Sequence, residues 1–207
     1  MNEKQVFFQS GGLRLEGMFA LNEPGLGAVV AHPHSLYGGT MDDYVVGIAV
    51  SALARGGWST LRFNFRGVGD SGGDFDQGRG EAEDMTAAAD YLKRQGMGRL
   101  LAAGYSFGAY AAARAWPGLS ALGADPLVLI APPASMMNFD FLTPETRIGL
   151  IVCGQEDPIA PPDAARELNA RLATPATLTV IPSADHFFGG AAQALAQALA
   201  DYLAGKN

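Results

Sequence analysis

Residues 100–108 read Leu-Leu-Ala-Ala-Gly-Tyr-Ser-Phe-Gly and join an apolar run to a serine flanked by glycines. The apolar run has the composition of a buried strand, and the alanine-rich stretch that follows it is typical of a helix. Between them, Gly104-x-Ser106-x-Gly108 has the spacing of a nucleophile elbow, which holds a serine at a sharp turn from strand to helix. Side chains at the glycine positions would collide with neighbouring backbone. The pattern therefore predicts an exposed, reactive Ser106, and the alternative is a glycine-rich turn that merely contains a serine.

The rest of the chain alternates between strand-like and helix-like segments after an N-terminal hairpin, which is centred on Ser10-Gly11-Gly12. This alternation predicts the α/β class, with a mostly parallel sheet of about eight strands and helices on both faces. The expected strands are residues 6–9, 13–21, 27–31, 59–65, 100–105, 127–131, 148–153 and 177–181. The expected helices are residues 44–55, 81–95, 107–116, 163–172 and 191–203.

Composition limits the class of protein. A length of 207 residues with 48% hydrophobic residues suits one folded domain that spans residues 1–207. The net charge of −7 makes nucleic acid an unfavourable partner, and the single cysteine, Cys153, excludes an internal disulfide and is expected to be a buried, inert thiol. Neither a signal-like nor a membrane-spanning apolar run is found, so we expect a cytoplasmic protein that does not enter membranes. The oligomeric state does not follow from these features.

A serine hydroxyl becomes a strong nucleophile only when a base removes its proton. The chain has three histidines, His32, His34 and His186. His186 follows the last expected strand and precedes the last expected helix, so it should lie at the same edge of the sheet as Ser106. We predict that His186 is the base, and the alternative is a histidine in a surface loop.

The base needs a carboxylate to orient it. Asp157 follows the penultimate expected strand and is the predicted acid, although an aspartate before Pro158 also commonly caps a turn. Glu156 and Asp140 are rival candidates. Asp185 is discounted because neighbours in sequence rarely face one another.

Two backbone N–H groups should hold the negative charge that develops on the substrate oxygen. One is expected from Phe107, directly after the nucleophile. The other is expected from the loop after the strand at residues 27–31, where Pro33 has no N–H. The backbone of His34 is therefore the predicted donor, with Ser35 as the alternate.

The segment at residues 132–147 is too short to form a separate lid of several helices. Its Met136, Met137 and Phe139 either pack locally under a loop or form an apolar wall beside the acyl pocket, where we expect substrate binding. A glycine-rich loop at residues 64–73 lacks the spacing of a nucleotide-binding loop. We expect no cofactor and no metal.

Four blocks of sequence, in order, make the chain resemble the α/β-hydrolase superfamily, and in particular its small lidless bacterial members. The blocks are His32–Met41, Phe63–Gly69, the elbow at residues 104–108 and the His-Phe-Phe at residues 186–188. The subgroup often has proline where this chain has Ser35.

The resemblance implies a Ser-Asp-His triad in the order Ser106, Asp157 and His186. It also implies a carboxylesterase-like serine hydrolase that cleaves a small ester or thioester through an acyl-enzyme. The alternatives are an amidase or peptidase of the same fold, or a binding protein of this fold that has no activity.

Overall fold

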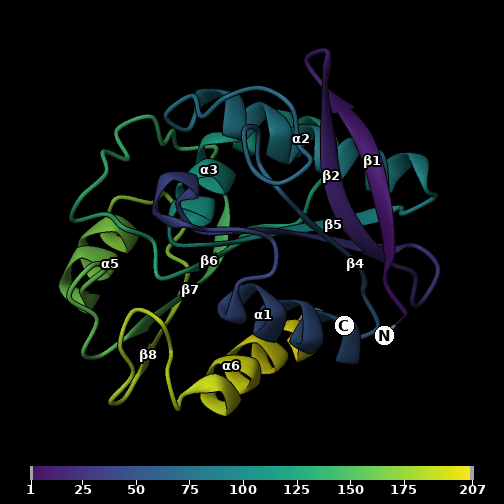
Figure 1. Ribbon diagram of the computed structural model, residues 1–207. Helices are drawn as coiled ribbons and strands as arrows, with labels where there is room; N and C mark the ends of the chain where they lie inside the picture. Colours follow the sequence, from purple (N-terminus) through teal and green to yellow (C-terminus); the bar gives the residue numbers. More distant parts are fainter. Residues whose placement is uncertain (1, 206–207) are drawn as a thin grey trace.

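The computed structural model describes residues 2–205 and contains an eight-stranded sheet (Figure 1). The strands lie in the order β1-β2-β4-β3-β5-β6-β7-β8. Only the β1–β2 and β2–β4 pairs are antiparallel, so the N-terminal hairpin extends an otherwise parallel sheet. The strands are β1 (Lys4–Ser10), β2 (Leu13–Ala20), β3 (Leu26–Ala31), β4 (Ser59–Phe63), β5 (Arg99–Tyr105), β6 (Leu127–Ile130), β7 (Ile148–Gly154) and β8 (Thr177–Ile181).

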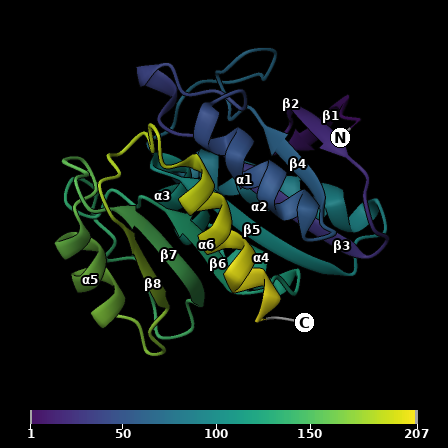
Figure 2. The ribbon, with the colours of Figure 1, turned by 90° about the horizontal axis from the view of Figure 1, so that it is seen from below.

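Helices cover both faces of this sheet. Two of them, α1 and α6, pack side by side on one face, and α2, α3, α4 and α5 pack on the other (Figures 1 and 2). The helices are α1 (Tyr44–Arg55), α2 (Arg79–Arg94), α3 (Phe107–Arg114), α4 (Trp116–Ala121), α5 (Pro162–Ala170) and α6 (Ala192–Ala204), with a 3₁₀ turn, η1, at Ser35–Tyr37. The predicted α/β class, hairpin and two-sided helical cover are confirmed.

The central strand β5 is buried on both faces because it is apolar throughout most of its length. Leu100 and Ala102 pack into the core under α2 and α3, whereas Leu101, Ala103 and Tyr105 pack into the core under α1 and α6. Alternate residues of a strand point to opposite faces, so one apolar run supplies both cores. The strand therefore anchors Ser106 in the middle of the sheet.

Two short helical segments differ from the sequence prediction. The expected helix at residues 107–116 is two helices, because the chain continues into α4 beyond Ala115. The expected helix ends at Trp116, but Pro117 lies in the first turn of α4, where a proline loses no hydrogen bond. The turn η1 was missed because three residues carry no helical period.

Between β6 and β7 the chain forms turns and no helix, all of it within the described part of the structure. The fold therefore has no lid over the carboxyl ends of the strands. Among residues 2–205, no helix combines the length and apolar character needed to cross a bilayer.

Candidate active site

Ser106 occupies a strained turn between β5 and α3. Its φ of 54° and ψ of −117° lie where a residue with a side chain is seldom found. The neighbouring backbone packs closely against the turn on both sides of Ser106. A Cβ at Gly104 would overlap the carbonyl oxygen of Gly108, and one at Gly108 would overlap that of Ala31. Glycine is thus required at both flanking positions, as the elbow pattern predicts.

The loops that follow β7 and β8 bring an acid and a base to this serine. His186 Nε2 lies 3.0 Å from Ser106 Oγ, and His186 Nδ1 lies 2.7 Å from Asp157 Oδ2. The other carboxylate oxygen of Asp157 accepts N–H groups from Ile159 at 2.8 Å and Ala160 at 2.7 Å. With Asp157 and His186 each only 3% exposed, the acid is fixed by its own turn and in turn orients the imidazole.

This geometry determines the chemistry available to His186. An ionised carboxylate can only accept hydrogen bonds, so Nδ1 carries the proton that points at Asp157. The lone pair on Nε2 then faces the hydroxyl of Ser106. The arrangement can transfer the serine proton to the imidazole while the carboxylate stabilises the resulting charge.

The rival acids lie elsewhere. Asp140 is exposed and forms an ion pair with Arg171 at 2.7 Å. Glu156 is exposed, and the carboxylate of Asp185 accepts N–H groups within its own loop, from Phe187 at 3.0 Å among others. Of these candidate acids, Asp157 is therefore the one whose carboxylate bonds to the predicted base.

The predicted donors for a substrate oxygen face the same cavity. Phe107 and His34 both line it, whereas Ser35, the alternate donor, does not. Within residues 2–205, the backbone N–H groups of Phe107 and His34 have no acceptor, so both are available to a ligand. The His34 ring is used for structure instead: its Nδ1 accepts the N–H of Leu36 at 3.2 Å, and the ring lies 4.8 Å from that of Phe107.

His32 has a structural role in the loop after β3. Its Nδ1 lies 2.6 Å from the carbonyl oxygen of Pro33, and its Nε2 accepts the N–H of Phe65 at 3.1 Å. Burial lowers the pKa of His32 to about 4, so the ring is neutral at neutral pH. It ties the loop after β3 to the end of β4.

The cavity beside Ser106 has a volume of about 360 Å³ and mostly apolar walls. Met136 and Met137 line it, as predicted for a substrate wall. Phe139 does not, and that part of the prediction is wrong. Its side chain is 2% exposed and packs in the core against Tyr110 and Phe141, at ring distances of 5.3 and 5.7 Å.

Two further residues of the site were not predicted. Tyr105 donates its hydroxyl to the carbonyl oxygen of His186 at 3.0 Å, and the two rings lie 5.4 Å apart. Asp43 caps α1 and lines the cavity. Tyr105 directly precedes the predicted nucleophile and Asp43 directly precedes an expected helix, but neither position indicates the contact that the side chain makes in the site.

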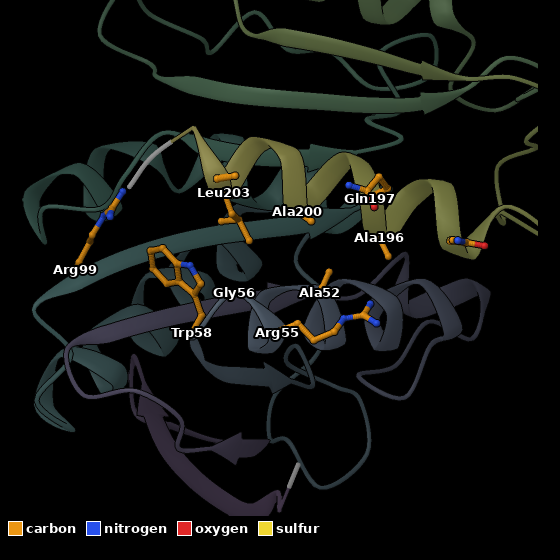
Figure 3. Close-up of a pocket in the computed structure, with 11 residues that line it drawn as sticks. Ala52, Arg55, Gly56, Trp58, Arg99, Ala196, Gln197, Ala200 and Leu203 are labelled. Atoms are coloured by element: carbon orange, nitrogen blue, oxygen red, sulfur yellow. The ribbon is translucent and has the colours of Figure 1, made fainter.

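A second hollow lies between α1 and α6, at the amino ends of β4 and β5 (Figure 3). Its volume of about 460 Å³ exceeds that of the cavity at Ser106. Small residues such as Ala52 and Ala196 line it, together with Trp58 and Arg55. It offers no serine, histidine or carboxylate, so size alone is a poor guide to the reactive site. Across the described residues, no group of three or more His, Cys, Asp or Glu side chains is placed to hold a metal ion.

No model of a known protein family matches the chain. The chain is 35% identical over 217 residues to an uncharacterised protein of Rickettsia prowazekii (strain Madrid E). The match covers 96% of this chain and 88% of the relative. A solved structure from Xanthomonas campestris, described as an α/β serine hydrolase without lid, is 34% identical with a TM-score of 0.89 and covers 100% of this chain and 95% of that one. An α/β serine hydrolase homologue from Coxiella burnetii is 32% identical with a TM-score of 0.88, and the match covers 97% of both chains.

Proposed function

The chain belongs to the α/β serine hydrolases without a lid, and from that premise we propose that it cleaves a small ester or thioester through an acyl-enzyme on Ser106. The observation that carries the proposal is the continuous set of hydrogen bonds from Ser106 through His186 to Asp157, at 3.0 and 2.7 Å. These three side chains come from three separate loops at one edge of the sheet. A nucleophile, a base within hydrogen-bond reach and a third group that orients the base are the signature of an activated hydroxyl.

In the first half of the reaction, Ser106 Oγ attacks the acyl carbon of the substrate. The hydroxyl proton passes to His186 Nε2, and Asp157 stabilises the imidazolium that forms. The carbonyl oxygen becomes an oxyanion, which the N–H groups of Phe107 and His34 stabilise. When the carbonyl reforms, the bond to the alcohol or thiol breaks, and the leaving group takes the proton from His186.

The second half uses the same groups with water as the nucleophile. Water attacks the acyl carbon, and His186 takes the water proton as it took that of the serine. The bond to Ser106 then breaks, the acid product leaves and the serine recovers its proton. The strained backbone of Ser106 keeps Oγ in position through both halves.

The size of the cavity supports short acyl groups. A volume of about 360 Å³ suits a small ligand, and no lid extends the apolar surface over a long chain. Met136 is 73% exposed at the cavity, so its wall is adaptable and open to solvent. Acetyl and butyryl esters should therefore be better substrates than octanoyl and palmitoyl esters.

Labelling with a fluorophosphonate, followed by rates for p-nitrophenyl esters of increasing acyl length, tests this function. We expect one label per chain, on Ser106, and the highest kcat/KM for the short esters. Ser106→Ala should lose both the label and the hydrolysis, whereas the buried Ser59→Ala should retain the label. A label that survives Ser106→Ala would disprove the assignment of the nucleophile, and a preference for palmitoyl esters would disprove the short-acyl substrate.

A further inference from the structure

The charges around the cavity at Ser106 are one-sided. Among residues 2–205, no lysine or arginine lines it, and Asp43 is the only carboxylate that does. The cavity is thus an apolar, aromatic space with a single negative side chain beside the predicted nucleophile. This pattern bears on which substrates can enter.

Asp43 has one carboxylate oxygen to spare. Its Oδ1 accepts the N–H of Val45 at 2.8 Å, which caps α1. Within residues 2–205, Oδ2 has no hydrogen-bond or ion-pair partner. The amino end of α1 carries only about half a positive charge, so it does not cancel the full charge of the carboxylate.

The charge of Asp43 acts close to the nucleophile. Burial and, next, the Asp43 carboxylate raise the pKa of the Tyr105 hydroxyl above its usual value. Tyr105 directly precedes Ser106 and bonds to the backbone of His186. Asp43 and Ser106 line the same cavity, so a ligand group held by Asp43 would share that cavity with the scissile bond.

Aromatic rings supply the second half of a site for an organic cation. Tyr37, Phe107 and Phe187 line the same cavity, and Tyr37 and Phe187 are 87% and 62% exposed. Aromatic faces attract ammonium groups, and the net charge of −7 favours the approach of cations over anions.

We propose that Asp43 is a specificity-determining residue, and that the preferred substrates are short esters with a positively charged nitrogen close to the ester group. The carboxylate attracts the charge, and the aromatic rings pack against its alkyl substituents. This inference rests on the proposed function and adds the substrate class to it. Esters that carry a carboxylate or phosphate at the same place should be poor substrates.

Butyrylcholine and 3,3-dimethylbutyl butyrate test the proposal, because they have the same shape and differ in the charge of one atom. We would measure kcat/KM for both and take their ratio in the wild type and in Asp43→Asn. Asparagine caps a helix as well as aspartate does, so the variant removes the charge and keeps α1 intact. We expect the ratio to fall about tenfold, which corresponds to about 1.4 kcal/mol of transition-state discrimination. Comparing the ratios removes the difference between the two leaving groups.

Asp42→Asn is the matched control. Asp42 is the neighbouring carboxylate, 71% exposed, which pairs with Arg62 and does not line the cavity at Ser106. In Asp42→Asn, the ratio of kcat/KM for butyrylcholine to kcat/KM for 3,3-dimethylbutyl butyrate should equal that of the wild type. Asp43→Ser, which also caps helices, should lower the ratio as Asp43→Asn does.

Each outcome decides the proposal. A ratio that is unchanged in Asp43→Asn, or equally lowered in Asp42→Asn, overturns it. If the protein cleaves p-nitrophenyl acetate and does not cleave butyrylcholine, the proposed preference for cationic substrates is overturned and the proposed function stands. If no ester is cleaved and the phosphonate does not react, the proposed function fails and this inference fails with it.

Discussion

The loop after β3, residues 32–43, and the loop after β8, residues 182–191, lie at the same edge of the sheet, and each begins near a buried histidine. Both ring nitrogens of His32 are bonded to backbone, one to the carbonyl of Pro33 and the other to the N–H of Phe65. Both ring nitrogens of His186 are bonded to side chains, one to Asp157 and the other to Ser106.

Both histidines are buried, so the type of bonding partner, rather than burial, distinguishes the histidine that we propose as the base. A backbone N–H bonded to Nε2 cannot give up its proton, so His32 is locked in one tautomer. The hydroxyl bonded to Nε2 of His186 can give up its proton, and in the proposed mechanism Asp157 compensates the charge that forms. His32 therefore ties the first loop to the chain after β4, whereas the second loop places His186 against Ser106, as the proposed mechanism requires.

The largest expected effect separates these two histidines. His186→Ala should lower kcat for a short ester by about 10⁴-fold or more, because the serine loses its base. His32→Gln keeps a donor and an acceptor in the ring's place, and its kcat should stay within about tenfold of the wild type. Steady-state kinetics with p-nitrophenyl acetate measures kcat for both variants. A larger loss in His32→Gln than in His186→Ala would reverse the roles of the two loops.

The next effect tests whether the side-chain partner of His186 makes it a base. Asp157→Asn should lower kcat by about 10³- to 10⁴-fold while the protein stays folded, because the amide no longer favours the correct tautomer. Asp140→Asn is the control, since its carboxylate pairs with Arg171 at the surface, and its kcat should change by less than about twofold. Equal losses in the two variants would contradict the assignment of the acid.

Much of the sheet edge that carries the candidate site could be predicted from the sequence, because it depends on hydrophobic periodicity and on the order of the elements along the chain. Apolar runs bounded by turn residues gave the eight strands, and parallel strands bring their carboxyl ends to one edge. Ser106, Asp157 and His186 each follow such a strand, so strand order predicts that they lie at one edge, but it also left Glu156 and Asp140 open as the acid. The segment boundaries differ by one to two residues in most elements, since strand ends carry little pattern.

The features of the site that could not be predicted depend on tertiary contacts, which leave no periodic pattern in the sequence. Phe139 and Met136 lie in one apolar segment without a repeat, so the sequence does not tell which faces the cavity and which faces the core. Tyr105 reads as a strand residue, and nothing local indicates that its hydroxyl reaches a loop 81 positions away. Asp43 reads as a helix cap, which leaves its second oxygen unaccounted for.

The pH dependence of stability tests whether the ring of His32 stays neutral in the folded protein. Its pKa is about 4 in the folded protein and about 6.5 when unfolded, so the unfolded chain binds the extra proton between these values. The contribution of His32 to stability is therefore present above pH 6.5 and falls by about 3 kcal/mol as the pH drops to 4. Urea unfolding at pH 7, 5.5 and 4 measures it. Between pH 7 and pH 4, the free energy of unfolding of His32→Gln should fall less than that of the wild type. If the two proteins had the same dependence of this free energy on pH, His32 would not stay neutral in the folded protein.

The smallest effect concerns how the loop after β8 is anchored. Tyr105 and Tyr202 both donate a hydroxyl to a backbone carbonyl oxygen, of His186 at 3.0 Å and of Pro126 at 3.3 Å. Either change to phenylalanine removes one such bond, so each variant should lose about 1 kcal/mol of stability. Only Tyr105→Phe loosens the backbone of His186. Its kcat and its rate of phosphonate labelling should fall by about five- to tenfold with KM unchanged, because a displaced imidazole reaches Oγ less often. Tyr202→Phe should keep the wild-type kcat. If both variants lost stability and neither lost activity, the loop after β8 would hold His186 in place without Tyr105, through Asp157 and its own turns.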